Sequence, residues 1–370
     1  MIGEGANLGV TQSARIELSR QGIRLNGDFI DNAAGVNMSD YEVNLKIVLS
    51  QLVASNHISS IEDRHALFKS VTDDVTDLVL ANNQKNHRLL SMDQLRSQKD
   101  SALFFKLIHH LVTQNHLNPA EECIPDTSKL EIMITHHEVL PRPLLATLQA
   151  YVKMDIYKTL RESSMIEKEN FESLYQSYFP DSIYQCSPEE VHRHRLKNDI
   201  ICTLLTNDIV NQAGTTFFFK MQQLTAATIS DITIAYLLAN QLVDGPVIKP
   251  MILTSSASSE VQYRHLLQVE QSIEVIVIDL LQLPDITLSF SLLPQLAHVK
   301  HTHLPHNDQD LSSRLAAMRH YHELVSLFYL NQSKNIDIPS AITVLTLLDD
   351  IFEFKWVCDQ LLSLELSLQW

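Results

Sequence analysis

The chain has 370 residues, a length that accommodates about two domains and a sizeable hydrophobic core. Its 44 acidic and 28 basic residues give a net charge of −16 at pH 7, so phosphate-rich surfaces would be repelled and we expect no nucleic-acid partner. No run approaches the roughly 18 consecutive apolar residues of a membrane span, and we expect a soluble protein with no membrane partner. The four cysteines lie far apart and no secretory signal is visible, which favours the cytoplasm.

Glycine is scarce and unevenly distributed. The chain contains 8 glycines, and six of them precede residue 36. An average chain of this length would hold roughly 25. Glycine-rich loops allow the backbone to approach a ligand, whereas a glycine-poor, leucine-rich remainder is typical of packed helices. The sequence therefore changes character near residue 36.

The opening segment has the pattern of an α/β unit. Residues 1–5 are predicted to end a short strand, residues 11–21 to form a helix and residues 24–26 to form a second strand. Residues 32–35 are a loop of small residues. The tetrapeptide Ser39–Glu42 that follows has the pattern of a capping box, in which the serine and the glutamate satisfy the first free amides of a long helix.

The remainder of the chain has mostly helical patterns. Ser187–Glu190 is a strong helix start, which we expect to open a helix with one apolar face formed by Ile201, Leu204, Leu205 and Ile209. A second apolar stripe, typical of a helix core, consists of Leu144, Leu145, Leu148, Tyr151, Val152 and Ile156. The run Ser272–Ile278 fits a strand or a helix, and its period does not decide between them.

The Gly3–Gly9 segment is the first candidate binding loop. It is similar to the dinucleotide fingerprint G-x-G-x-x-G, but its third glycine stands one position late. Short glycine-rich loops are also common without a ligand. Taken alone, the segment is a weak indication of nucleotide binding.

Two motifs in register are more specific. Gly5-Ala6-Asn7 is followed about 25 residues later by Asn32-Ala33-Ala34-Gly35-Val36 and then Ser39 and Glu42. This combination resembles the glutamate dehydrogenase family, and in particular its large bacterial NAD-specific members. Residues 140–153 and 194–217 resemble the helical C-terminal region of the same large enzymes. Ala34 departs from the glycine usual in the small enzymes, and Ser13 stands where the large enzymes often have arginine.

The resemblance implies roles for six residues. Gly5, Ala6 and Asn7 would bind the NAD cofactor, with Asn7 at its nicotinamide end. Asn32, Val36 and Ser39 would be substrate-binding residues that line the joint pocket for nicotinamide and substrate. Ser39 would hydrogen-bond the distal carboxylate of L-glutamate. The residues also have purely structural interpretations, because asparagine stabilises turns and serine caps helices.

The resemblance also implies a fold class and a division of the chain. We expect a mainly α protein with a short α/β remnant of a Rossmann nucleotide-binding domain at its N-terminus. Residues 1–38 would end the NAD-binding domain, residues 39–58 would form a connecting helix, and residues 59–370 would form a helical C-terminal domain.

The implied reaction is the oxidative deamination of L-glutamate to 2-oxoglutarate and ammonia by a homo-oligomeric enzyme. Hydride transfer of this kind needs a lysine of lowered pKa and a carboxylate that relays protons. In the family both lie upstream of these motifs, so we locate no catalytic residue here. We expect a C-terminal part of a larger enzyme that is inactive alone.

Two other functions are compatible with the sequence. The chain would be a non-catalytic helical interaction or scaffold module if the opening motif is a relic. It would belong to a leucine, valine or phenylalanine dehydrogenase if the distal part of the substrate differs.

A histidine-rich segment is the remaining candidate site. It contains residue types that bind zinc or nickel, namely His298, His301, His303, His306, Asp308 and Asp310. The polar residues around Pro305 favour a solvated loop, and we predict no physiological metal site.

Overall fold

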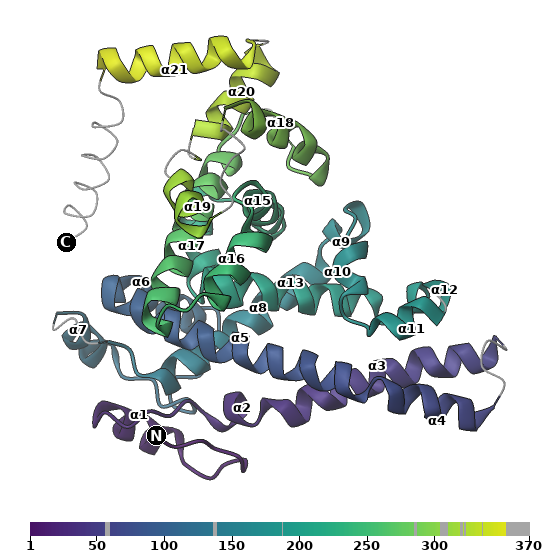
Figure 1. Cartoon of the computed structure of the whole chain (residues 1–370). Helices are drawn as coiled ribbons and strands as arrows, with labels where there is room; N and C mark the ends of the chain where they lie inside the picture. Colours follow the sequence, from purple (N-terminus) through teal and green to yellow (C-terminus); the bar gives the residue numbers. More distant parts are fainter. Residues whose placement is uncertain are drawn as a thin grey trace. The chain divides into compact units, whose positions relative to one another are not determined.

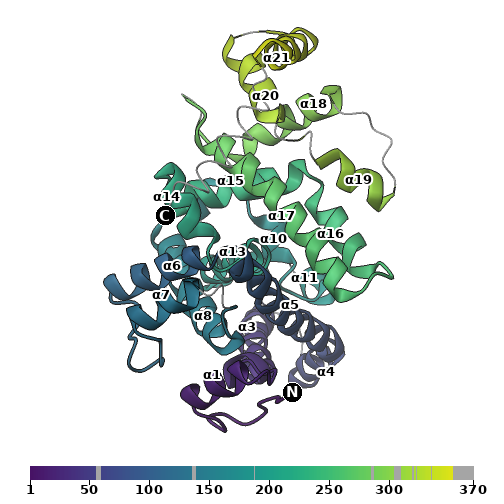
Figure 2. The same ribbon diagram turned by 90° about the vertical axis from the view of Figure 1, so that its left-hand side faces the viewer.

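The computed structural model divides the chain into two compact units, residues 1–233 and 234–370. The boundary lies within α15 (Ile229–Leu242). Figures 1 and 2 show that helices build both units. The described residues are 1–55, 60–135, 139–186, 188–284, 287–303, 310–318, 321, 323–334 and 336–352.

Unit 1 contains three long helices and many short ones. In chain order they are α1 (Gln12–Arg20), α2 (Asp28–Asp31), α3 (Ala33–Ala54), α4 (Ile61–Ser70), α5 (Thr72–Lys99), α6 (Ser101–Thr113), α7 (Thr127–Thr135), α8 (Arg142–Glu162), α9 (Met165–Lys168), α10 (Glu172–Gln176), α11 (Asp181–Cys186), α12 (Pro188–His192), α13 (Lys197–Ala213) and α14 (Phe217–Thr225).

The core of unit 1 lies between α8, α13 and α5, which pack against one another. The α8 stripe is buried at Leu144, Leu148 and Ile156, and the α13 stripe is buried at Ile201 and Ile209. Both stripes are therefore core, as their helical spacing predicted. The predicted long helix from residue 187 is wrong, because α12 ends at His192 and α13 is a separate helix; Ser187 itself lies outside the described residues.

The two predicted N-terminal strands are not formed. Residues 1–5 and 24–26 have neither helix nor strand, and a single backbone hydrogen bond joins them, from the Ile2 amide to the Arg24 carbonyl at 2.8 Å. A ladder needs repeated pairing between extended segments, and one bond does not provide it. The helix between them is confirmed, because α1 begins directly after Thr11, whose hydroxyl accepts from the Ala14 amide.

The helix predicted to begin at Ser39 begins six residues earlier. Helix α3 includes Ala33 and Gly35, so Ser39 lies inside it and donates to the Gly35 carbonyl at 3.1 Å. Two consecutive alanines favour helix strongly enough to offset one glycine. The capping-box interpretation was wrong, although the long helix itself is confirmed.

Unit 2 is also helical, and its helices pack mainly against α17 and α20. Its helices after α15 are α16 (Gly245–Thr254), α17 (Ser259–Leu281), the short 3-10 helix η1 (Phe290–Leu292), α18 (Leu293–His303), α19 (Leu311–Ala317), α20 (Glu323–Lys334) and α21 (Ile338–Phe352). The ambiguous run Ser272–Ile278 is part of α17, with Ile273, Ile276 and Val277 fully buried.

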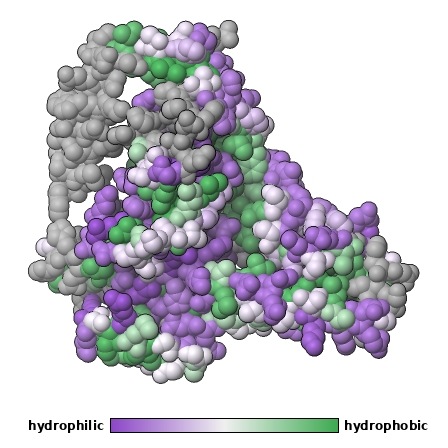
Figure 3. All heavy atoms as spheres, in the orientation of Figure 1, coloured by the Kyte–Doolittle hydropathy of each residue, from purple (hydrophilic) through white to green (hydrophobic). Residues whose placement is uncertain are grey.

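The described residues thus form a mainly α protein, as predicted, and none of their helices is long and apolar enough to cross a membrane. Hydrophilic and hydrophobic residues are interspersed on the face drawn in Figure 3. The predicted functional boundaries at residues 38 and 58 stay a prediction.

Candidate functional site

A buried arginine fixes the N-terminal loop. Arg15 on α1 donates from Nε and Nη2 to the two carboxylate oxygens of Glu4, each at 2.7 Å. Its Nη2 also lies 3.1 Å from Oδ1 of Asp28. The three side chains are at most 10% exposed. The loop before α1 and the start of α2 are therefore held together by one desolvated ion cluster.

The charges in this cluster stabilise one another. The hydrogen bond to Glu4 is the main cause that raises the pKa of Arg15 above its ordinary value. Burial alone would raise the pKa of Asp28, but hydrogen bonds from the amides of Leu8 and Phe29, together with Arg15, outweigh it and lower the pKa. Both shifts favour the charged forms of Arg15 and Asp28 at neutral pH.

Asp28 also shapes the loop tip. Its Oδ2 accepts from the Leu8 amide at 2.7 Å, and Leu8 has a left-handed φ of 58°. This conformation costs a non-glycine residue roughly 1 kcal/mol, which the charge-assisted hydrogen bond offsets. The geometry of the Gly5–Gly9 loop is thus set by a carboxylate 20 residues further along the chain.

A second polar chain connects the loop to the long helices. The Glu4 amide donates to Asp31 at 3.0 Å, and Asp31 accepts from Asn26 at 2.7 Å. Asn26 in turn accepts from Nε of Arg142, the first residue of α8, at 2.6 Å. Gln12 adds a bond to Thr147 on α8 at 3.0 Å. These bonds fasten the candidate site to the core of unit 1.

The structure brings the two predicted motifs together. The side-chain amide of Asn32 donates from Nδ2 to Oδ1 of Asn7, 25 residues away in the sequence. Neither the Nδ2 of Asn7 nor the Oδ1 of Asn32 is bonded to another described residue. The pair therefore presents one free donor group and one free acceptor, which is the complement of a carboxamide such as the one on nicotinamide.

Gly5 and Ala6 lie beside this pair on the exposed loop. A Cβ added to Gly5 would meet nothing within 4 Å, and its φ is not in the left-handed region. The fold itself does not require glycine at this position. Space is thus open for a ligand to approach the backbone here, and the residues present fit the nicotinamide end of NAD.

Asn32, Val36 and Ser39 lie on one side of the start of α3. Asn32 is the N-cap residue, and Val36 and Ser39 follow at a spacing of four and three residues. Residues at this spacing share a helix face. Val36 is 74% exposed, and Ser39 is also exposed. The face has the apolar and hydroxyl groups that a small acid would contact.

Sequence reasoning missed the residues that position the loop. Glu4 and Asp28 each precede one of the two motifs, and Arg15 is one of two arginines in the helix between them. An arginine with an acidic residue on either side within 30 residues is a possible sign of an ion pair. Whether these residues pair depends on the tertiary structure, which the sequence pattern does not show.

Sequence reasoning also missed a perturbed lysine on α8. Nζ of Lys153 donates to Oδ1 of Asn86 at 2.8 Å and to Oδ1 of Asn211 at 2.6 Å. Burial lowers the pKa of Lys153 to about 7, although Asp208 and Asp93 oppose the shift. The lysine is thus partly neutral at physiological pH.

The histidine-rich segment is described only in part. His298 and His301 lie exposed on α18. The side chains of His303 and His306 and the residue Asp308 lie outside the described residues. Among the described residues no group of three possible ligands meets.

Comparisons with protein families identify the class of protein. A family described as the catalytic domain of bacterial NAD-glutamate dehydrogenase matches residues 1–93, which include both motifs. A family described as the C-terminal part of glutamate dehydrogenase matches residues 137–290. Together the two matches cover about two thirds of the chain.

Three curated relatives agree with this class, and each is named an NAD-specific glutamate dehydrogenase. The Halomonas elongata protein is 31% identical over 269 residues, which are 72% of this chain and 17% of the relative. The Pseudomonas aeruginosa protein is 34% identical over 242 residues, which are 65% of this chain and 15% of the relative. The Mycobacterium tuberculosis protein is 33% identical over 236 residues, which are 64% of this chain and 14% of the relative.

The chain belongs to the bacterial NAD-glutamate dehydrogenase family, which confirms the resemblance seen in the motifs. It spans about one sixth of the length of the curated relatives it matches.

Proposed function

We propose that this chain forms part of an enzyme that oxidises L-glutamate with NAD+ and water to 2-oxoglutarate, ammonium, NADH and a proton. The observation that carries the proposal is the hydrogen bond between Asn7 and Asn32, since it joins the cofactor motif to the substrate motif. The family matches and the names of the relatives support it independently.

Asn7 and Asn32 would hold the carboxamide of nicotinamide through their free donor and acceptor. Gly5 and Ala6 would let the cofactor approach the loop backbone. NAD supplies the hydride acceptor when it is bound, and these residues orient its reacting ring.

Val36 and Ser39 would contact the substrate. Among the described residues, the Ser39 hydroxyl bonds only the Gly35 carbonyl. Rotation of its side chain would let it donate to the distal carboxylate of glutamate. Val36, which is 74% exposed, would pack against the methylene groups of the substrate.

The finer organisation is part of the proposal. Residues 1–38 would complete a Rossmann nucleotide-binding domain, and the two extended segments joined by Ile2 and Arg24 would become strands when neighbouring strands pair with them. The enzyme would be a cytoplasmic homo-oligomer. We expect the 370-residue chain alone to be inactive, because neither motif contains the lysine that the reaction needs.

A matched pair of serines on α3 provides the test. Ser39 and Ser50 both donate to the carbonyl four residues before them, at 3.1 and 2.7 Å, and both are exposed. In the enzyme that contains this chain, Ser39→Ala should raise KM for glutamate about tenfold, whereas Ser50→Ala should leave it unchanged. Absence of glutamate-dependent NADH formation, or equal effects of the two variants, would refute the proposal.

A further inference from the structure

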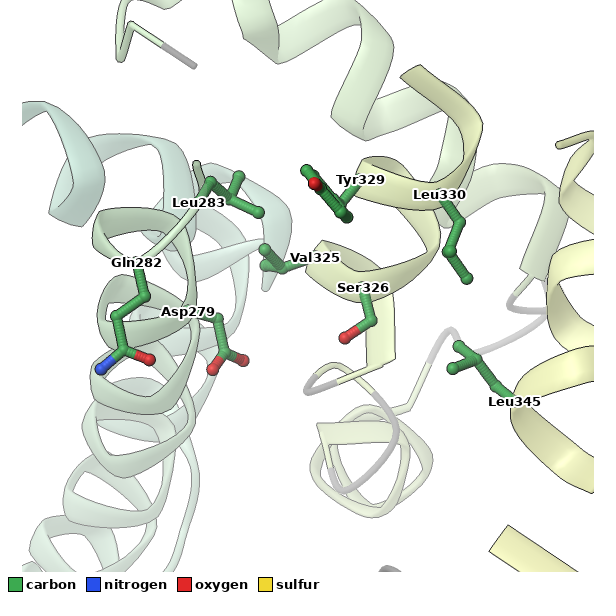
Figure 4. Close-up of a pocket in the computed structure, with 8 residues that line it drawn as sticks. All are labelled: Asp279, Gln282, Leu283, Val325, Ser326, Tyr329, Leu330 and Leu345. Carbon is green, nitrogen blue, oxygen red and sulfur yellow. The ribbon is translucent and has the colours of Figure 1, made fainter. Parts of the chain in front are cut away.

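Unit 2 contains a cavity that the proposed reaction does not use. Its volume is about 270 Å³, and it lies where the C-terminal end of α17 meets α20 and α21. Figure 4 shows its lining, in which the carboxylate of Asp279 points from α17 toward α20. The hydroxyl-bearing residues Ser326 and Tyr329 and the apolar residues Val325 and Leu345 form the opposite wall.

Asp279 is an isolated acid. It is partly buried, and its carboxylate has no hydrogen-bond or ion-pair partner among the described residues. Burial raises the pKa of Asp279 to about 6, and no charged neighbour among the described residues contributes to the shift. At pH 7.5 an ionised carboxylate therefore faces a cavity whose described lining residues are half apolar and include no cationic side chain, an arrangement that costs free energy unless a cation occupies it.

The composition of the walls defines the complementary ligand. A primary ammonium group pairs with a carboxylate and offers its remaining hydrogens to hydroxyl oxygens. The leucine and valine side chains favour a short apolar group on the same molecule. The volume lies just below the usual lower bound of small-molecule pockets, roughly 300 Å³, which limits the ligand to a small molecule.

We propose that this cavity binds a small primary ammonium compound with a short apolar group, with its nitrogen on Asp279 and its apolar part against Val325 and Leu345. The site is independent of the Asn7–Asn32 pair. Most of its lining residues lie beyond residues 137–290, the range matched by the C-terminal family.

A second cavity in unit 2 serves as an internal comparison. It has a volume of about 440 Å³ and lies between α17 and α19, with His265, Gln268 and Ser312 among its lining residues. It offers no carboxylate, so it has no basis for preferring an ammonium ligand over a neutral one. Binding there would be insensitive to a change at Asp279.

The test compares three ligands of the same shape and different charge. 3-Methylbutylamine, 3-methylbutan-1-ol and 3-methylbutanoate are titrated into the 370-residue chain at pH 7.5 and followed by ligand-observed NMR. We expect the amine to saturate one site with a Kd on the order of 1 mM, the alcohol to bind at least about tenfold more weakly, and the carboxylate not to bind. At pH 5 the amine should bind about tenfold more weakly than at pH 7.5, since the carboxylate is then mostly protonated.

Two variants on α17 localise the binding. Asp279→Asn should make the amine and the alcohol bind equally, whereas Glu260→Gln, an exposed acid on the same helix, should leave the preference intact. Circular dichroism at the same pH shows that both variants remain folded. No amine binding at 20 mM ligand, equal binding of amine and alcohol to the unaltered chain, or an amine preference that survives Asp279→Asn would each overturn the proposal.

Discussion

Arg15 is the residue whose loss should most damage the N-terminal site. Arg15→Met removes two hydrogen bonds of 2.7 Å to Glu4 and the contact of 3.1 Å to Asp28. It leaves two carboxylates buried and unpaired, and removing one partner of a buried ion pair typically costs about 3–5 kcal/mol. Part of the cost is relieved if the loop opens and its carboxylates reach water, so we expect a loss of about 3 kcal/mol in the free energy of unfolding of unit 1.

Urea denaturation followed by circular dichroism measures this loss, and hydrogen exchange of peptides from residues 1–27 localises it. The control is Arg20→Met, an exposed arginine on the same helix, which should change the free energy of unfolding by less than about 0.5 kcal/mol. Glu4→Gln in the Arg15→Met background should recover about 1–2 kcal/mol, because it removes a stranded charge. A loss below about 1 kcal/mol, or unchanged exchange in residues 1–27, would refute the interpretation of the cluster.

Three further predictions concern single residues. The pKa of Lys153 is about 7 in the folded chain and near 10.5 in the unfolded chain, so the folded state becomes more stable as pH rises above 7. The free energy of unfolding of unit 1 should therefore rise by about 1 kcal/mol per pH unit between pH 7 and 9. Urea titrations of Lys153→Gln should show no such pH dependence. The pKa of Asp279 is raised to about 6, so unit 2 is most stable when this carboxyl group is protonated. Asp279→Asn should therefore raise the free energy of unfolding of unit 2 by about 1–2 kcal/mol at pH 7.5 and have no effect at pH 3.5. Gly5→Ala should change the melting temperature by no more than about 1 °C but raise KM for NAD at least about fivefold. Gly3→Ala, where an added Cβ also meets no contact, should leave KM for NAD unchanged. Equal effects of the two substitutions would contradict the cofactor role of the loop.

Local patterns predicted the helices that carry strong periodicity. The stripes on α8 and α13 are core because apolar residues at helical spacing have few alternatives to burial against another helix. Helix boundaries were less predictable. Ser39 has the local sequence of a cap, but two alanines before it extend α3 to residue 33, and their contribution outweighs the single hydrogen bond of a cap.

The candidate site was also predictable only in part. The motif residues Asn7 and Asn32 were singled out through the family resemblance, and their side chains contact one another in the structure. Their roles in binding stay a prediction. The groups that fix the loop were not found, because the pairing of Arg15 with Glu4 and Asp28 depends on how α1 packs against the loop. The lowered pKa of Lys153 is also invisible in sequence, since it results from burial.

A double-mutant cycle on Asn7 and Asn32 tests the central claim most directly. The quantity is kcat/KM for NAD in glutamate oxidation by the enzyme that contains this chain, for Asn7→Ala, Asn32→Ala and the double variant. If the two amides hold one nicotinamide together, each single change removes the joint site, and the double variant should lose little more than the worse single variant. Losses that multiply, with no interaction between the two positions, would show that the residues act separately and would contradict a shared cofactor site.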